Sequence, residues 1–310
     1  MNTSSDGKAS IRCPLCAGSN ARLKKSFDAG AIALSWMDEL GIDIGDEFKG
    51  VTQIDLHACA DCALDFFAPD SVAGSPALYE KLEKVDGYYL PEKWEHDMAL
   101  RDMDGARNGL EVGCGFGAFV DRVVRERGIS FEGCEQNPSA VRVAQAKGIS
   151  VRLENLEDLA RRSPGTYDVI CSFQVLEHVT EPGSFLKSAC TLLRPGGKLI
   201  FGVPNSKSYI KHMFHIFDAP PHHMTRWNSE TLRRLPNLLP VESVRVAYEP
   251  LPIYRTDWYV RVHESMLRRH GLGRMIHPWL RSRALRFVRY SFVRRLLRGD
   301  TIYGCYVRKP

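Results

Sequence analysis

The residues LEVGCGFG, at positions 110–117, lie between a short apolar run and a helix-like segment that begins near Ala118. Glycine occupies every second position from 113 to 117, which lets the backbone turn tightly and come within contact distance of a ligand. A glycine-rich turn at the start of a helix also presents free N–H groups and the positive end of the helix dipole. The stretch therefore predicts a strand, a ligand-binding turn and a helix, with a purely structural tight turn as the alternative.

The rest of the chain after residue 108 alternates between apolar runs and helix-like segments. Continuous apolar runs such as VICSF (169–173) and KLIFGV (198–203) are typical of buried parallel strands. Regular alternation of this kind predicts an α/β protein with helices on both faces of a parallel sheet. Two further strands are expected at 241–248 and 301–307.

Composition excludes several classes of protein. The 310 residues are 44% apolar and 25% charged, which fits a globular chain and excludes a disordered or collagen-like one. The polar first ten residues lack the apolar core of a signal peptide, and no run approaches a membrane span. Nine cysteines, an odd number, favour reduced thiols over a disulfide framework. We therefore expect a cytoplasmic protein.

Two acidic residues frame the glycine-rich turn. The carboxylate of Glu111 would repel a pyrophosphate but suits a cationic ligand such as an amine or a sulfonium. The third glycine also comes one position too early for the Gly-x-Gly-x-x-Gly pattern of dinucleotide binding, which disfavours a nicotinamide oxidoreductase. Glu135 ends the next expected strand, where an acid can hold a ribose diol. As an ordinary surface acid, Glu135 would need no such role.

These features, with ENLEDL (154–159), YDVICSFQVLEHV (167–179) and LLRPGGKLIFGVPN (192–205), resemble the class I S-adenosylmethionine-dependent methyltransferases in order and spacing. The resemblance covers roughly residues 108–206 and implies a Rossmann-like, doubly wound, seven-stranded sheet. Within it, Glu135 would hold the ribose, Gln136 and Asn155 would lie at the adenine, and Gln174 near the methyl donor. An Asp is more usual at position 155. The implied cofactor residues are Glu111, Gly113, Gly115, Gly117, Glu135, Gln136, Asn155, Leu156 and Gln174.

Two Cys-x-x-Cys pairs precede this region, Cys13 with Cys16 and Cys59 with Cys62. Each pair offers two sulfurs to one tetrahedral ion, and the long intervening loop closes at little extra entropic cost. We predict one structural zinc held by all four thiolates, with buried thiols or a site that has lost its metal as the alternative. The other five cysteines are expected in the core.

The pairs followed by the glycine loop are similar to a subgroup of methyltransferases that act on sugars and related small molecules. A hydroxyl acceptor needs a general base, and histidine is the usual choice near neutral pH. The stretch from His223 resembles one that in those relatives begins with Glu-His and carries the proposed base. Because His222 replaces that Glu, we expect His223 as the base without a carboxylate partner. His178, which follows the fourth strand, is the second candidate, with a structural loop contact as its alternative.

The expected domains are a zinc-ribbon-like module (1–75), a helical linker (76–107), the cofactor-binding domain (108–250), a basic helical insertion (251–299) and the last strand (300–310). The expected function is S-adenosylmethionine-dependent O-methylation of a sugar, a lipid-linked glycan or a related small molecule. N- or C-methylation of a similar acceptor is the first alternative. A non-enzymatic zinc-ribbon protein that binds nucleic acid is the second, and no feature of the ribbon shows a nucleic-acid role.

The segment 261–298 contains eleven arginines and one acid, Glu264. Such a basic lobe suggests an anionic partner or a solvated helical face. From Leu280 to Arg289 we expect Leu280, Ala284, Phe287 and Val288 on one helical face. That arrangement is compatible with peripheral contact to an anionic membrane or with a helix packed on the catalytic domain.

Overall fold

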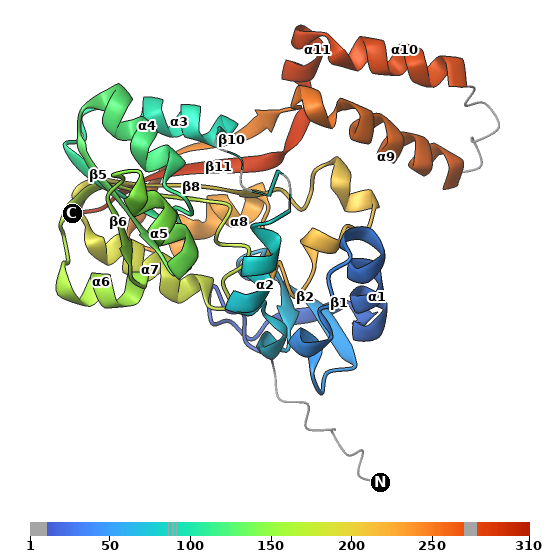
Figure 1. The fold of residues 1–310 in the computed structure, drawn as a ribbon, viewed down its shortest axis with the longest axis horizontal. Helices are drawn as coiled ribbons and strands as arrows, with labels where there is room; N and C mark the ends of the chain where they lie inside the picture. The colour runs from blue at the N-terminus through green and yellow to red at the C-terminus, as the bar shows by residue number, and fades with distance from the viewer. Residues whose placement is uncertain (1–10, 86, 89, 91, 270–277) are drawn as a thin grey trace.

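The computed structural model describes residues 11–85, 87, 88, 90, 92–269 and 278–310, with the side chains of residues 278–280 left out. Within these ranges the larger sheet has seven strands in the order β10-β11-β8-β7-β4-β5-β6 (Figure 1). The strands are β4 (Asn108–Val112), β5 (Ser130–Glu135), β6 (Val151–Leu153), β7 (Tyr167–Phe173), β8 (Leu193–Pro204), β10 (Val241–Pro250) and β11 (Arg298–Arg308). Strands β4 to β8 are parallel to one another, whereas β11 runs antiparallel to both β8 and β10. The predicted doubly wound, seven-stranded α/β fold is confirmed.

Helices cover both faces of this sheet. They are α3 (Trp94–Asp102), α4 (Ala118–Arg127), α5 (Pro138–Ala146), α6 (Leu156–Arg162), α7 (Pro182–Leu192) and α8 (Ser229–Arg234). The central strand β7 is buried along its whole length, and its side chains alternate between the two faces. Ile170 belongs to the core beneath α6, α7 and α8, whereas Val169 and Cys171 belong to the core beneath α3, α4 and α5. The five cysteines expected in the core are all buried.

The N-terminal region forms a second sheet in the order β1-β2-β3-β9. Its strands are β1 (Ala21–Asp28), β2 (Gln53–Cys59), β3 (Asp65–Ala68) and β9 (Thr225–Arg226), and its helices are α1 (Ala29–Leu40) and α2 (Pro76–Leu82). The short strand β9 comes from the later part of the chain and pairs with β3, Thr225 lying opposite Phe66. Met224 also belongs to the core of this module, beside Trp36 and Leu78. The module is therefore joined to the segment that carries His223.

The insertion between β10 and β11 consists of α9 (Thr256–Arg269), α10 (Pro278–Arg289) and α11 (Ser291–Leu296), which stand beyond one end of these strands in Figure 1. The expected apolar face of α10 is wrong in part. Val288 is buried, but Ala284 and Phe287 are exposed and Leu285 faces the core instead. The side chain of Leu280 lies outside the described residues. Among the described residues, no helix has the length and apolar character needed to cross a membrane.

Candidate functional site: a cofactor loop beside buried histidines

The glycine turn adopts a backbone that requires its glycines. Gly113, Gly115 and Gly117 have φ values of +72°, +52° and +76°, in the left-handed region. A Cβ on Gly113 would lie 2.5 Å from a methyl of Val175, and one on Gly117 would lie 2.9 Å from Ile149. Gly117 also begins α4 as its N-cap. The sequence therefore folds here into a tight turn that presents backbone N–H groups at a helix N-terminus.

Glu135 fixes this turn from the end of β5. Its Oε2 accepts a 2.9 Å hydrogen bond from the backbone N–H of Gly115. Its Oε1 accepts hydrogen bonds from the backbone N–H groups of Gln136 and Asn137, at 2.8 and 2.9 Å. These three donors orient the carboxylate, so that it lies directly beside the glycine turn.

Glu111 supplies a second carboxyl group beneath the same turn. The residue is only 4% exposed, and its Oε2 has no hydrogen-bond partner among the described residues. Burial raises the pKa of this carboxyl to about 8, against the opposing effect of Lys93. An unpaired buried carboxyl oxygen is costly unless a ligand satisfies it. The site therefore fits a cationic group such as the ammonium or sulfonium of S-adenosylmethionine.

The other expected cofactor residues lie at the ends of the neighbouring strands. After β6, Asn155 caps α6 by accepting a 2.7 Å hydrogen bond from the Asp158 N–H, and Leu156 is buried behind it. After β7, Gln174 has a φ of +59°. All nine predicted residues thus belong to β4, β5, β6 or β7 or follow their carboxyl ends, the edge where open α/β sheets bind ligands.

Sequence reasoning missed Glu95 on α3. This residue is 2% exposed, and its Oε1 accepts a 2.8 Å hydrogen bond from Nε2 of Gln174. Its side chain also lies against Gly202 of β8, where a Cβ would come within 2.9 Å. The sequence carries no local signal for this contact. Glu95 precedes the glycine turn, and it meets Gln174 and Gly202 only because α3 packs over β7 and β8 in the folded protein.

His178, His222 and His223 form one cluster, in which His222 and His223 are buried and His178 is partly exposed. The ring centroids of His178 and His223 are 4.9 Å apart, and those of His222 and His223 are 4.5 Å apart in a stacked arrangement. His178 Nδ1 lies 2.7 Å from the carbonyl oxygen of His222, so it must carry the proton, which leaves Nε2 with a lone pair. Burial lowers the pKa of His178 to about 4 and holds that of His223 well below the ordinary value. Both rings are therefore neutral at pH 7, the state that a proton acceptor needs.

His222 has a different set of contacts. Its Nδ1 lies 3.0 Å from the carbonyl oxygen of Phe217 and its Nε2 lies 3.0 Å from the hydroxyl of Tyr88. The nitrogens of the three histidines lie close enough together to suggest a metal. However, both nitrogens of His222 already have protein partners and its ring stacks on His223, so we assign His222 a structural role.

The expectation that His223 lacks a carboxylate partner is corrected in part, because one carboxylate lies near His223 but outside hydrogen-bond distance. Asp218 Oδ1 lies 3.6 Å from His223 Nδ1, and Asp218 Oδ2 is buried without a hydrogen-bond partner among the described residues. Asp218 lies five positions before His223, in the 3₁₀ turn Ile216–Asp218. The sequence showed only that His222 replaces the adjacent Glu. The chain supplies its carboxylate by turning back through Pro220 and Pro221.

The four cysteines of the two Cys-x-x-Cys pairs meet in space. Cys13 Sγ lies 3.5 Å from Cys62 Sγ, Cys16 Sγ lies 3.6 Å from Cys59 Sγ, and all four sulfurs are within 4.8 Å of one another. A tetrahedral ion with Zn–S bonds of about 2.3 Å requires sulfurs about 3.8 Å apart, so the donor set fits zinc. The hydrogen bond from Cys62 lowers the pKa of Cys13 to about 6, which favours a thiolate there.

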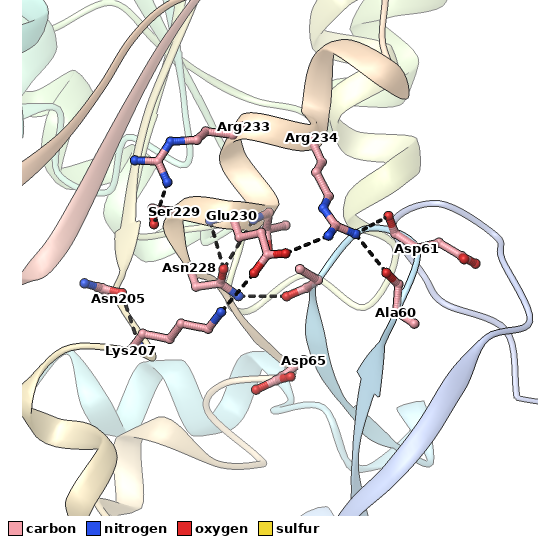
Figure 2. A network of polar contacts seen from close by, with 12 residues as sticks. Ala60, Asp61, Asp65, Asn205, Lys207, Asn228, Ser229, Glu230, Arg233 and Arg234 are labelled. Carbon is pink, nitrogen blue, oxygen red and sulfur yellow. Dashed lines mark hydrogen bonds and ion pairs between the residues drawn. The ribbon is translucent and has the colours of Figure 1, made fainter.

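Both cysteine pairs are attached to the larger domain. The N–H of Gly183, in the first turn of α7, donates a 3.1 Å hydrogen bond to the carbonyl of Pro14. At the second pair, Arg234 Nη1 donates 2.8 Å hydrogen bonds to the carbonyls of Ala60 and Asp61, and Asn228 Nδ2 donates one of 2.7 Å to the carbonyl of Ala63 (Figure 2). The contacting segments follow His178 and His223 in the chain. The cysteine site thus connects the two segments that bear the candidate bases.

Comparison with known proteins agrees with this geometry. A family model described as a methyltransferase domain matches residues 81–237, just over half of the 310 residues. A ubiquinone biosynthesis O-methyltransferase from Xanthomonas oryzae pv. oryzae is 32% identical over 121 residues, covering 37% of this chain and 50% of that protein. Another from Albidiferax ferrireducens is 36% identical over 110 residues, covering 33% and 43%. The chain therefore spans about half the length, or less, of these curated relatives.

Among solved structures, a SAM-dependent methyltransferase from Archaeoglobus fulgidus superimposes with a TM-score of 0.47 at 15% identity, covering 75% of this chain and 98% of that one. The sheet order, the glycine turn and the acid after β5 define a class I methyltransferase fold with a four-cysteine N-terminal module. The chain belongs to the methyltransferase domain family.

Proposed function

We propose that this protein transfers a methyl group from S-adenosylmethionine to a hydroxyl of a small molecule, with His223 as the general base. One observation carries the proposal above all. Val175 lies against Gly113 in the cofactor turn, and three residues later the same segment presents His178, whose ring is 4.9 Å from that of His223. The segment 175–178 therefore contacts the glycine turn at one end and presents His178 to His223 at the other.

Bound S-adenosylmethionine would supply an electrophilic methyl group on a sulfonium. The ionised Glu111 carboxylate would offset the positive charge of the cofactor, and Glu135 would accept from the ribose hydroxyls. His223 would take the proton of the acceptor hydroxyl as its oxygen forms the new C–O bond and the C–S bond breaks. Asp218 would stabilise the resulting imidazolium at Nδ1, in the way that a buried carboxylate supports a catalytic histidine.

The acceptor hydroxyl could belong to either of two classes of molecule, a sugar or glycan, or a phenol or quinol. The Cys-x-x-Cys module favours the sugar, glycan or lipid-linked glycan expected from the sequence. The names of the relatives favour a phenolic or quinol hydroxyl instead, although the matched segments span about half of those proteins or less. Either acceptor would need a hydroxyl proton removed, so both use the same base.

Calorimetry with S-adenosylmethionine and NAD, followed by mass spectrometry of product mixtures, tests this function. We expect binding of S-adenosylmethionine alone, and a gain of one methyl group on a nucleotide sugar, a glycan or a catechol in a panel of acceptors. Binding of NAD in preference to S-adenosylmethionine would refute the cofactor assignment. Methylation confined to amine or carbon acceptors would refute the O-methyltransferase assignment.

We also propose that Cys13, Cys16, Cys59 and Cys62 hold one structural zinc. Four thiolates complete a closed shell, so the ion would stabilise the fold and leave no open coordination position for catalysis. Elemental analysis of protein purified without chelator should find one zinc per chain. The Cys13→Ser/Cys59→Ser variant should lose it, whereas Cys305→Ala, at a buried cysteine in the core beneath α3, α4 and α5, should retain it. Zinc retained in the double variant would refute the assignment.

A further inference from the structure

Four large apolar side chains are exposed at the junction of α10 and α11. Phe287 and Tyr290 are each 58% exposed, Phe292 is 63% exposed and Leu296 is 80% exposed. Phe292 and Leu296 are four positions apart in α11 and so lie on one helical face. The rings of Tyr290 and Phe292 stack with centroids 5.9 Å apart. These four exposed residues are called here the apolar corner.

The apolar corner is not needed to hold the insertion on the protein. The inward faces of these helices already contribute Val288, Val260 and Val262 to a separate core with Tyr209 and Leu251. Val293 of α11 is also buried, whereas its neighbours Phe292 and Leu296 point outward. Figure 1 shows α10 above α9 and α11 at the end of the insertion that adjoins β10 and β11. The corner therefore faces outward from a helical unit that is already packed.

Exposed arginines lie on the same two helices as the corner. Arg286, Arg289 and Arg295 are exposed and have no ion pair with any residue that the structure describes. The inner arginines differ, because Arg281 and Arg268 pair with Asp257 or Glu264 of α9. The positive charge of the insertion is thus left unpaired next to its exposed aromatic and leucine side chains.

We propose that the apolar corner and its three arginines dock this protein on an anionic lipid bilayer. An interfacial helix inserts apolar and aromatic side chains at the boundary of the headgroups and acyl chains, while cations at its flanks contact lipid phosphates. Juxtaposed basic residues add to this attraction near an anionic leaflet. A nucleic acid would use the arginines but would leave Phe292 and Leu296 without a favourable environment. Exposed apolar side chains together with unpaired arginines therefore favour a lipid surface over a nucleic acid.

The insertion that carries the corner also packs on the chain segment that leads to the candidate site. Tyr209 packs against Trp258 and Tyr259 of α9, with ring centroids 5.6 and 5.1 Å apart. Tyr209 begins the 3₁₀ turn Tyr209–His212, from which the chain continues to Asp218 and His223. The insertion thus contacts the segment that leads directly to the candidate base. The proposal does not depend on which acceptor is methylated.

Co-sedimentation of the full chain with vesicles tests this docking. Vesicles of phosphatidylcholine containing about one third phosphatidylglycerol should bind the protein at low salt, and binding should fall with added salt. Phe292→Ser/Leu296→Ser and Arg286→Gln/Arg289→Gln/Arg295→Gln should each weaken vesicle binding by about tenfold or more. Val244→Ser, which removes a 54% exposed apolar side chain from β10, is the matched control and should bind normally.

Three results would overturn the proposal. The first is no sedimentation with anionic vesicles at low salt. The second is equal loss of binding in Val244→Ser, which would show that the effect is not local to the corner. The third is a dimer in light scattering that Phe292→Ser/Leu296→Ser dissociates, with no vesicle binding by either form, which would assign the corner to contact between two copies. Circular dichroism of each variant checks that it remains folded.

Discussion

Arg234 of α8 donates a 2.8 Å hydrogen bond from Nη1 to the backbone carbonyl of Asp61, inside the second Cys-x-x-Cys loop. The same nitrogen reaches the carbonyl of Ala60 at 2.8 Å, and Nη2 donates to Glu230 at 2.6 Å (Figure 2). One side chain of the larger domain therefore holds two carbonyls of the cysteine loop. The same helix starts at Asn228, which is attached to Ala63.

Replacing Arg234 should weaken this attachment. Arg234→Met removes the two hydrogen bonds to the cysteine loop and the ion pair with Glu230, and we expect the free energy of unfolding to fall by about 1–3 kcal/mol, with faster loss of zinc to a chelator. Arg233→Met is the matched control, because Arg233 donates to the nearby Ser229 and does not reach the cysteine loop. Thermal unfolding and a chelator time course measure both effects. Equal behaviour of the two variants would contradict the attachment.

Loss of the Glu135 carboxylate should weaken cofactor binding by about tenfold or more, because the ribose diol would lose its acceptor and the turn at Gly115 would lose its hydrogen bond. Calorimetry on Glu135→Ala measures the change. Glu126→Ala is the control, since Glu126 pairs with Arg122 on the exposed side of α4. Unchanged affinity in Glu135→Ala would refute the assignment of this residue.

Cofactor affinity should depend on pH through Glu111. Burial raises the pKa of this carboxyl to about 8, so the free protein is largely protonated there at neutral pH. A cationic ligand favours the ionised form and lowers the pKa in the complex. Affinity should therefore rise with pH, by at most about tenfold per unit, and level off above the pKa of the free protein.

Titrations with S-adenosylmethionine between about pH 6 and about pH 9 measure this dependence. The Glu111→Gln variant should bind S-adenosylmethionine more weakly than the wild type at high pH. Its affinity should vary with pH only through the ionisable groups of S-adenosylmethionine itself. If the wild-type and Glu111→Gln proteins show the same slope, the carboxyl is not coupled to the cofactor.

Methylation should require His223 much more than cofactor binding does. A general base contributes roughly 10²–10⁴-fold to rate without contacting the sulfonium, so His223→Ala should lose turnover in that range and bind cofactor normally. His263→Ala, on α9 of the insertion, should retain turnover. Activity that persists in His223→Ala but disappears in His178→Ala would transfer the role to His178. Activity that persists in both would show that the acceptor needs no protein base.

The sequence by itself determined the alternation of strands and helices from residue 108 and the glycine turn between β4 and α4. The glycines from 113 to 117 specify a left-handed backbone that side chains rarely adopt, and the apolar run 169–173 specifies a buried strand. Both are local signals, in which a few adjacent residues dictate one conformation. The four cysteines were also predictable as a group, because their chemistry limits their role even though 42 residues separate the pairs.

Contacts between distant segments decided the rest. Asp218 reaches His223 only through the turn at Pro220 and Pro221, and Glu95 reaches Gln174 only when α3 lies over β7 and β8. On α10, helical periodicity identified apolar positions but could not decide which of them face inward. Packing against Tyr209 and Leu251 buried Val288 and left Phe287 exposed. The sequence pattern shows which side chains share one face of a helix. Which face is buried depends on the segment that packs against the helix in the folded protein.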